Sequence, residues 1–251
     1  MKKWNVKVIS TGKFEVDKSL ETANKDIGSK IYAPSWVVAV WDEKKKILID
    51  TGVKDPEWVV DVYGLPYYQT ENERLENALK KYLNWSVDDV QIIINTHLHF
   101  DHCGNHHLFK NALFYVQKIE YETAFNPHVL QKSIYAQELF DSRAVNYFNW
   151  VFTNGEEEIL PGIKVIFTPG HSKGHQSVLI NTEEGVVCVT GDASNLSENL
   201  LFNLMPGVVL NTEDVITSLN AIRIRSDFFI AAHEPQIANL QTNGFPSTRG
   251  T

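Results

Sequence analysis

The sequence predicts a mixed α/β fold in which strands dominate and helices are interspersed. Nine short runs recur along the chain, most of them β-branched or aromatic and bounded by Gly, Asp, Asn or Pro, which is typical of buried strands. Residues 37–52 and 177–192 also share one pattern: strand, charged turn, strand, then Thr-Gly with a neighbouring Asp. Two related halves would each place a loop at the same end of a sheet, which favours a two-layer sandwich of sheets. Turn chemistry alone also explains the likeness, because hairpins often end in Gly.

The individual elements follow from local patterns. Strands are expected at residues 6–10, 36–41, 46–50, 90–95, 113–116, 163–167, 177–181, 186–190 and 228–232. Helices are expected at 71–84, where Leu75, Leu79 and Leu83 share one face, and at 118–125 and 213–223. The least patterned segment, 126–152, is rich in aromatic residues, including Tyr147. It is expected to form either a helical lid over a site or a satellite core.

Length and composition limit the classes of function. Chains of 251 residues exceed the usual domain of roughly 100 to 150 residues, but double-sheet folds of this size commonly form one domain, so residues 1–251 are expected to form a single domain. The net charge is −8 and no Lys or Arg run could follow a phosphate backbone, which argues against a nucleic acid partner. Lys7 interrupts the apolar stretch near the start, and no apolar run approaches the roughly 20 residues that span a bilayer. We therefore expect a cytoplasmic protein that has no membrane partner.

Five of the nine histidines lie in the stretch THLHFDHCGNHH, residues 96–107, directly after an apolar run. His97 and His99 are two residues apart, so they would point the same way as the strand ends. Asp101 and His102 would come from the turn beyond it. One mononuclear site rarely needs four such ligands from so short a segment, whereas two neighbouring metal ions would use them all.

Three further residues of the metal-binding type follow predicted strands elsewhere in the chain. They are His171 in FTPGHSKGH, Asp192 in VTGDAS and His233 in IAAHEP. Strand ends are where a rigid scaffold presents functional groups. Two tetrahedral or five-coordinate ions need ligands beyond the histidine stretch, and these three residues are the candidates.

The run HLHFDH, followed by TPGHSKGHQS, TGDAS and AAHE, resembles the metallo-β-lactamase superfamily over nearly the whole chain. The resemblance implies a four-layer αβ/βα sandwich with two divalent metal ions at the edge between two sheets. It assigns the first ion to His97, His99 and His171, the second to Asp101, His102 and His233, and a bridging role to Asp192. Zinc is the first expectation from this ligand set, and iron, manganese or cobalt remain open. Asp50 in LIDTG matches a position that supports a ligand histidine.

Asp192 also separates branches of the superfamily. The best-known β-lactamases carry Cys at that position, and the oxygen-reducing di-iron relatives carry Glu where this chain has His99. Processing nucleases would bring further domains or basic surface. The strings LFYVQKIEYETA, TPGHSKGHQSVLI and DASNLSEN instead resemble the N-acyl-homoserine lactonases. This resemblance implies that a hydroxide bridging the two metals opens a lactone ring ester, and that Asp101 carries the proton to the leaving oxygen.

Two departures from the lactonase pattern keep other activities open. Asn195 stands where the lactonases commonly have a Tyr that steadies the carbonyl oxygen, so we expect Asn195 to donate that hydrogen bond less effectively. Cys103 stands where they usually have the first of two glycines. A related lactonase, esterase, thioesterase or organophosphate hydrolase on the same metals is the alternative. A non-catalytic binding protein is disfavoured, because degenerate members usually lose ligands.

The remaining candidates receive structural expectations. His106 and His107 are expected to be solvated or capping residues, and His175 a structural or supporting hydrogen bonder. Cys103 and Cys188 are expected to be core fillers and make no disulfide framework. The aromatic residues of 58–68 are expected mainly to pack in a loop, with one or two reaching an acyl groove; they are Trp58, Tyr63, Tyr67 and Tyr68. The expected substrate is a small lactone or ester, and the protein is expected to be a monomer or homodimer.

Overall fold

The computed structural model describes residues 2–141, 148–237 and 244–248. Within these residues the strands form a seven-stranded sheet, in the order β4-β1-β2-β3-β5-β6-β7, and a five-stranded sheet, in the order β12-β11-β10-β9-β8. The first sheet comprises β1 (Asn5–Asp17), β2 (Lys30–Trp41), β3 (Lys46–Ile49), β4 (Tyr67–Tyr68), β5 (Ile92–Ile94), β6 (Leu113–Gln117) and β7 (Asn149–Thr153). The second comprises β8 (Glu157–Leu160), β9 (Ile163–Phe167), β10 (Gln176–Asn181), β11 (Val186–Val189) and β12 (Phe228–Ile230). The helices are α1 (Pro56–Tyr63), α2 (Leu75–Leu83), α3 (Phe100–Cys103), α4 (Lys118–Phe125), α5 (Ser197–Phe202) and α6 (Thr212–Arg225).

Side-chain alternation along the strands creates the layers. Val38 and Val40 of β2 join the core between the two sheets, where they meet residues such as Val178 of β10. Their neighbours Val37 and Ala39 face the other way and pack with α2. Because successive side chains of a strand point to opposite faces, a strand that is apolar at every position must be covered on both faces. This explains why the central strands read as unbroken apolar runs.

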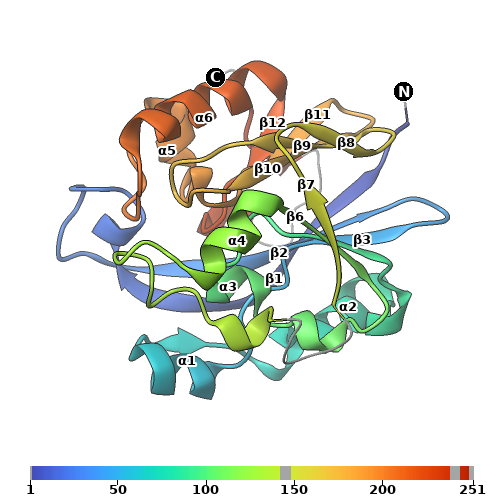
Figure 1. Cartoon of the computed structure of the whole chain (residues 1–251), viewed down its shortest axis with the longest axis horizontal. Coiled ribbons are helices and arrows are strands. Elements are labelled where there is room, and N and C mark those ends of the chain that lie inside the picture. The colour runs from blue at the N-terminus through green and yellow to red at the C-terminus, as the bar shows by residue number, and fades with distance from the viewer. Residues whose placement is uncertain (1, 142–147, 238–243, 249–251) are drawn as a thin grey trace.

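Helices cover the outer face of each sheet. Leu200 of α5 and Leu219 of α6 pack on Phe229 of β12, whereas Leu79 of α2 packs on Leu48 of β3. Figure 1 shows α5 and α6 above the five-stranded sheet and α1 and α2 below the seven-stranded sheet. The four-layer αβ/βα sandwich that the sequence predicted is therefore confirmed.

The two sheets share one pattern of strand pairing. In the first, β1 and β2 are antiparallel, β2 and β3 are antiparallel, and β3 is parallel to β5. In the second, β9, β10, β11 and β12 repeat this order of antiparallel, antiparallel and parallel pairs. The hairpins β2–β3 and β10–β11 overlap the two similar stretches of sequence, and Asp50 and Asp192 follow β3 and β11. The pairing agrees with two related halves.

All nine predicted strands and all three predicted helices are present, but several short elements were not predicted. These are β4, β7, β8, α1, α3 and α5. The helix predicted from residue 71 begins at Leu75, after a 3-10 turn over Glu71–Glu73. No helix among the described residues is long and apolar enough to cross a membrane.

The lid predicted for 126–152 is not helical in its described part, which holds one 3-10 turn, Gln137–Leu139, and then enters β7. Tyr135 and Phe140 are buried in a cluster with Phe100, so the alternative of a satellite core is the better description. Tyr147 lies outside the described residues.

Candidate metal centre

The seven residues predicted as metal ligands meet at one edge of the sandwich, each beyond the end of a strand or at the start of a short helix. His97 and His99 follow β5, and Asp101 and His102 lie in α3. The other three are His171 in the β9–β10 loop, Asp192 in the 3-10 turn after β11, and His233 after β12. All are buried except Asp101, which is half-buried. The two sheets thus bring together residues from both halves of the chain.

The ligand atoms fall into three groups of three, and within each group all of these atoms lie within 4.8 Å of one another. One group is His97, His99 and His171, and another is Asp101, His102 and His233. These are the two sets that the resemblance to the superfamily assigned to separate ions. The third group joins His97 and His102 through Asp192, the residue predicted to bridge.

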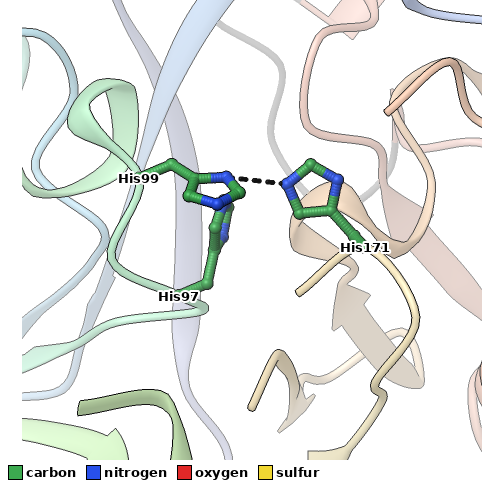
Figure 2. A group of neighbouring side chains, drawn as sticks. All are labelled: His97, His99 and His171. Carbon is green, nitrogen blue, oxygen red and sulfur yellow. Dashed lines mark hydrogen bonds between the residues drawn. The ribbon is translucent and has the colours of Figure 1, made fainter. Parts of the chain in front are cut away.

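The first group consists of imidazoles alone and is shown in Figure 2. His171 Nε2 lies 2.9 Å from His99 Nδ1, and the His97 ring meets the His99 ring edge-on with 4.4 Å between centroids. Three imidazoles thus bring nitrogen atoms to within 4.8 Å of one another. This arrangement suits a borderline-soft divalent ion such as zinc.

The second group contains a carboxylate, that of Asp101. Asp101 Oδ2 lies 3.6 Å from His102 Nε2 and 3.8 Å from His233 Nε2. Asp192 lies between the groups, with Oδ1 3.0 Å from His102 Nε2 and Oδ2 3.4 Å from His171 Nε2. Oδ2 also lies 3.5 Å from His233 Nε2, so the Asp192 carboxylate faces both groups.

Backbone carbonyls and a carboxylate fix the orientation of several of these rings. The Nδ1–H of His233 donates to Pro34 O at 2.8 Å, and that of His171 donates to Val208 O at 2.9 Å. His102 Nδ1–H donates to Asp50 Oδ2 at 2.8 Å. A hydrogen bond at Nδ1 selects the tautomer that leaves Nε2 free to bind a metal.

Asp50 also acts on His97, through Thr96. The Thr96 hydroxyl donates its one proton to Asp50 Oδ2 at 2.8 Å, so its oxygen accepts from His97 Nδ1, 3.0 Å away. Asp50 has a φ of 58°, an uncommon value for a non-glycine residue. Asp50 thus supports His102 of the second group directly and His97 of the first group through Thr96. The sequence predicted support for one ligand histidine only.

The unpaired atoms of the centre test whether metal ions fit. His97 Nε2, His99 Nε2, His102 Nε2 and Asp192 Oδ1 are buried and, among the described residues, have no hydrogen-bond partner. The 3.0 Å approach between His102 and Asp192 lacks hydrogen-bond geometry. Buried polar atoms without partners are costly, and here they are imidazole nitrogens and a carboxylate oxygen that converge. The donor set fits divalent metal ions.

The two sides differ in their electrostatics. Burial and the neighbouring His102 hold the pKa of His97 well below its usual value, and burial together with His171 does the same for His99. Burial also opposes a charge on His102, but Asp192, Asp101 and Asp50 raise its pKa well above the usual value. For His233, Glu21 and Asp192 outweigh burial and raise the pKa to about 10.

Glu120 connects the two loops that carry the imidazole group, and the sequence reasoning missed it. This fully buried carboxylate of α4 accepts hydrogen bonds from Leu98 N at 3.1 Å, between His97 and His99, and from Ser172 Oγ at 2.8 Å, beside His171. Two further hydrogen bonds come from Gly174 N and from the Tyr135 hydroxyl. The available signal was its position one turn before Ala124, on the face of α4 that is buried.

Glu21 is a second missed residue, and it contacts a predicted one. It is 6% exposed and accepts a hydrogen bond from Asn195 Nδ2 at 2.9 Å, although the surrounding sequence KSLETANKD reads as a solvated loop. Burial raises the pKa of Glu21, and the His233 charge opposes this shift. One N–H of the Asn195 amide is thus committed to a carboxylate. Its predicted role as donor to a substrate carbonyl depends on the second N–H.

A mainly apolar pocket of about 600 Å³, counting its open mouth, leads to the metal centre. Its walls include Phe14, Val16, Leu20, Leu65, Phe100, Ile134 and Val208, and its floor includes His99, Asp101, His171, Asp192 and His233. None of the four aromatic residues predicted from 58–68 lines it. Trp58 and Tyr63 pack on Phe100, and the Tyr67 hydroxyl donates to Thr11 O. Most of these side chains pack against the protein as expected, but from helix α1 and strand β4 and not from a loop, and the expected reach of one or two of them into this pocket is not seen.

The remaining histidines and cysteines lie outside the three groups. His106 is fully buried beside Phe114 and Trp150, and its Nε2 lies 2.8 Å from Asn95 Nδ2, so the expectation that it is solvated or capping is wrong. His107 is exposed as expected. His175 Nδ1 bonds to Thr168, which agrees with a structural role. Cys103 and Cys188 are buried free thiols.

Comparison with known proteins gives consistent results. The family profile described as the metallo-beta-lactamase superfamily matches residues 32–233. An N-acyl homoserine lactonase from Bacillus thuringiensis is 34% identical over 202 residues, which are 76% of this chain and 76% of that protein. Two solved structures of N-acyl homoserine lactone hydrolases have TM-scores of 0.79, at 29% and 30% identity, and cover 94% of this chain and 95% and 94% of theirs. The first holds the product N-hexanoyl-L-homoserine at its catalytic metal centre. The chain belongs to the metallo-β-lactamase superfamily.

Proposed function

We propose that the protein is a metal-dependent hydrolase that opens the ring ester of N-acyl homoserine lactones. The observation that carries the proposal is the convergence of seven predicted ligands, four of them with unpaired donor atoms and five of them lining an apolar pocket. The similarity to N-acyl homoserine lactonases along most of the chain supports this substrate class.

Two zinc ions would use the complete donor set. His97, His99 and His171 would hold one, Asp101, His102 and His233 the other, and Asp192 would join them. When bound, such ions lower the pKa of water to about 7 and polarise a carbonyl oxygen. Each imidazole would bind in its neutral form.

The protein groups would position the lactone and move its protons. The apolar wall, with Leu20, Leu65 and Val208, would receive the acyl chain and exclude water from the ester. Asp101 is half-buried and lines the pocket, so its carboxylate can accept a proton at Oδ2 and deliver it to the ring oxygen as the ester bond breaks. The second N–H of Asn195 would be a donor to the ester carbonyl oxygen.

Esterase, thioesterase or organophosphate hydrolase activity is the second candidate. The observation that favours it is the hydrogen bond from Asn195 to Glu21, because Asn195 stands where a lactonase commonly has Tyr and one of its N–H groups is committed to Glu21.

We further propose that residues 1–251 form one domain, since both sheets contribute to one core. The cytoplasmic location and the monomeric or dimeric state stay predictions.

A hydrolysis panel tests the proposed function. The metal-replete protein would be given N-acyl homoserine lactones, simple γ-lactones, thioesters and phosphotriesters. We expect the N-acyl homoserine lactones to have the highest kcat/KM, with one proton released and one product of substrate mass plus water. Preferred hydrolysis of a thioester or phosphotriester would support the second candidate instead.

A further inference from the structure

Glu21 is a buried carboxylate in the pocket wall that the proposed chemistry does not use. It is 6% exposed and lines the pocket together with Asp101, Asp192 and His233. Among the described residues no ion pair involves it, and its one side-chain hydrogen bond is the contact from Asn195 to Oε2. The other oxygen, Oε1, accepts no hydrogen bond from the part of the chain that the structure describes.

Burying a carboxylate with so few partners is unfavourable, because the loss of hydration must be offset by hydrogen bonds or a cation. The backbone at Glu21 is nevertheless held in place by hydrogen bonds from α5. Asn199 Nδ2 donates to Glu21 O at 3.3 Å and to Thr22 Oγ1 at 3.1 Å, and the Thr22 hydroxyl donates to Glu198 at 2.6 Å. The Glu21 segment is thereby fixed to α5, next to the loop that carries Asp192.

The pair offers hydrogen-bond acceptors to a bound molecule. The Asn195 NH2 donates to Glu21 Oε2 at 2.9 Å, so the amide is turned with its nitrogen toward the carboxylate. The amide oxygen Oδ1 of Asn195, which is itself 3% exposed, has no partner among the described residues. A substrate with an N–H donor beside its reacting carbonyl could donate a hydrogen bond to these acceptor oxygens in the pocket wall.

We propose that Glu21, held by Asn195, accepts a hydrogen bond from the amide N–H of the substrate and thereby selects N-acylated lactones. The inference rests on the proposed function. In an N-acyl homoserine lactone the amide nitrogen is two bonds from the ring carbonyl carbon, so the two groups enter the pocket together. Glu21 is then a specificity-determining residue, and Asn195 is a positioning residue for it.

The test compares two substrates that differ in one group. N-hexanoyl homoserine lactone carries the N–H, and α-hexanoyloxy-γ-butyrolactone has an ester oxygen in its place. Each kcat/KM is divided by the rate constant for alkaline hydrolysis of the same lactone, which removes the difference in intrinsic reactivity. We expect the metal-replete wild-type protein to prefer the amide by about 10- to 100-fold, the range of one hydrogen bond to a charged group.

Three variants then locate the preference. Glu21→Leu should bring the ratio to within about 3-fold of one, mainly by lowering kcat/KM for the amide. Asn195→Leu should bring the ratio into the same range but lower both kcat/KM values, because its second N–H is also the proposed donor to the ester carbonyl oxygen of either lactone. Asn220→Leu, on the exposed side of α6, is the matched control and should keep the wild-type ratio. Calorimetric binding of the ring-opened product N-hexanoyl homoserine should weaken by a similar factor in Glu21→Leu.

Each outcome decides the matter. Hydrolysis of both lactones without a normalised preference in the wild-type protein overturns this inference and leaves the proposed function standing. A preference that survives in Glu21→Leu also overturns it, because the selective group must then lie elsewhere. Hydrolysis of neither lactone overturns both proposals.

Discussion

The two sides of the candidate metal centre differ in charge although they share one edge of the sandwich. The side of His97, His99 and His171 contains no carboxylate of its own, and burial lowers the pKa of His97 and His99. The side of His102 and His233 holds Asp101, and there the carboxylates raise both histidine pKa values.

This difference separates two requirements of a hydrolytic centre. On the imidazole side, His97 and His99 are ready to bind a cation without losing protons, whereas on the carboxylate side His102 and His233 hold protons that a cation must displace. Asp192 contacts both and Asp50 supports both. A substitution on one side is therefore expected to weaken metal binding on that side only. Asp192 and Asp50 are the exceptions, because both sides share them.

The largest effect is expected from Asp192→Ala, which removes the group common to both sides. We expect binding of both ions to weaken and lactone hydrolysis to fall by more than about 100-fold, the upper end of losses from outer-shell substitutions. His171→Ala should instead release one ion and retain the other. Metal analysis after dialysis checks both variants, and retention of both ions by Asp192→Ala would break the account of Asp192 as the shared group.

A smaller and one-sided effect is expected from Glu120→Gln. The Gln amide cannot accept the hydrogen bonds from both Leu98 N and Gly174 N in the way the carboxylate does, so the loops of His97, His99 and His171 should loosen. We expect a loss of about 10- to 100-fold in affinity for the ion on the imidazole side. Stepwise metal titration measures it.

Glu122→Gln is the matched control, because Glu122 is exposed on the same helix. It should leave both metal affinities unchanged. Equal weakening of the two ions by Glu120→Gln would show that Glu120 supports the whole fold and not one side of the centre.

The smallest effect is a difference in proton release. A raised pKa means that His102 and His233, the latter at about 10, are protonated at pH 7 in the metal-free protein, whereas His97 and His99 are neutral. Because ligands bind metal in deprotonated form, loading the carboxylate side should release a proton from each of His102 and His233. Calorimetry in buffers of different ionisation enthalpy measures this release, and an equal value for both sides would remove the distinction.

Much of the fold and the ligand candidates could be predicted because each signal was local. Apolar runs showed the nine strands, and metal-type residues at strand ends marked His171, Asp192 and His233. Glu21 could not be found in this way, since the residues that contact it, such as Asn195 and Asn199, are distant in the chain. The burial of His106 has a similar cause, because Phe114 of β6 and Trp150 of β7 pack against it. Strand β7 was itself not predicted, since it lies in a segment without a clear pattern.

The most direct test of a two-sided hydrolytic centre is the rate of N-hexanoyl homoserine lactone opening as zinc is added to metal-free protein. The account predicts little activity up to one equivalent of zinc, a steep rise as the second equivalent binds, and no further rise beyond two. Full activity at one equivalent, or no ring opening with two ions bound, would contradict it.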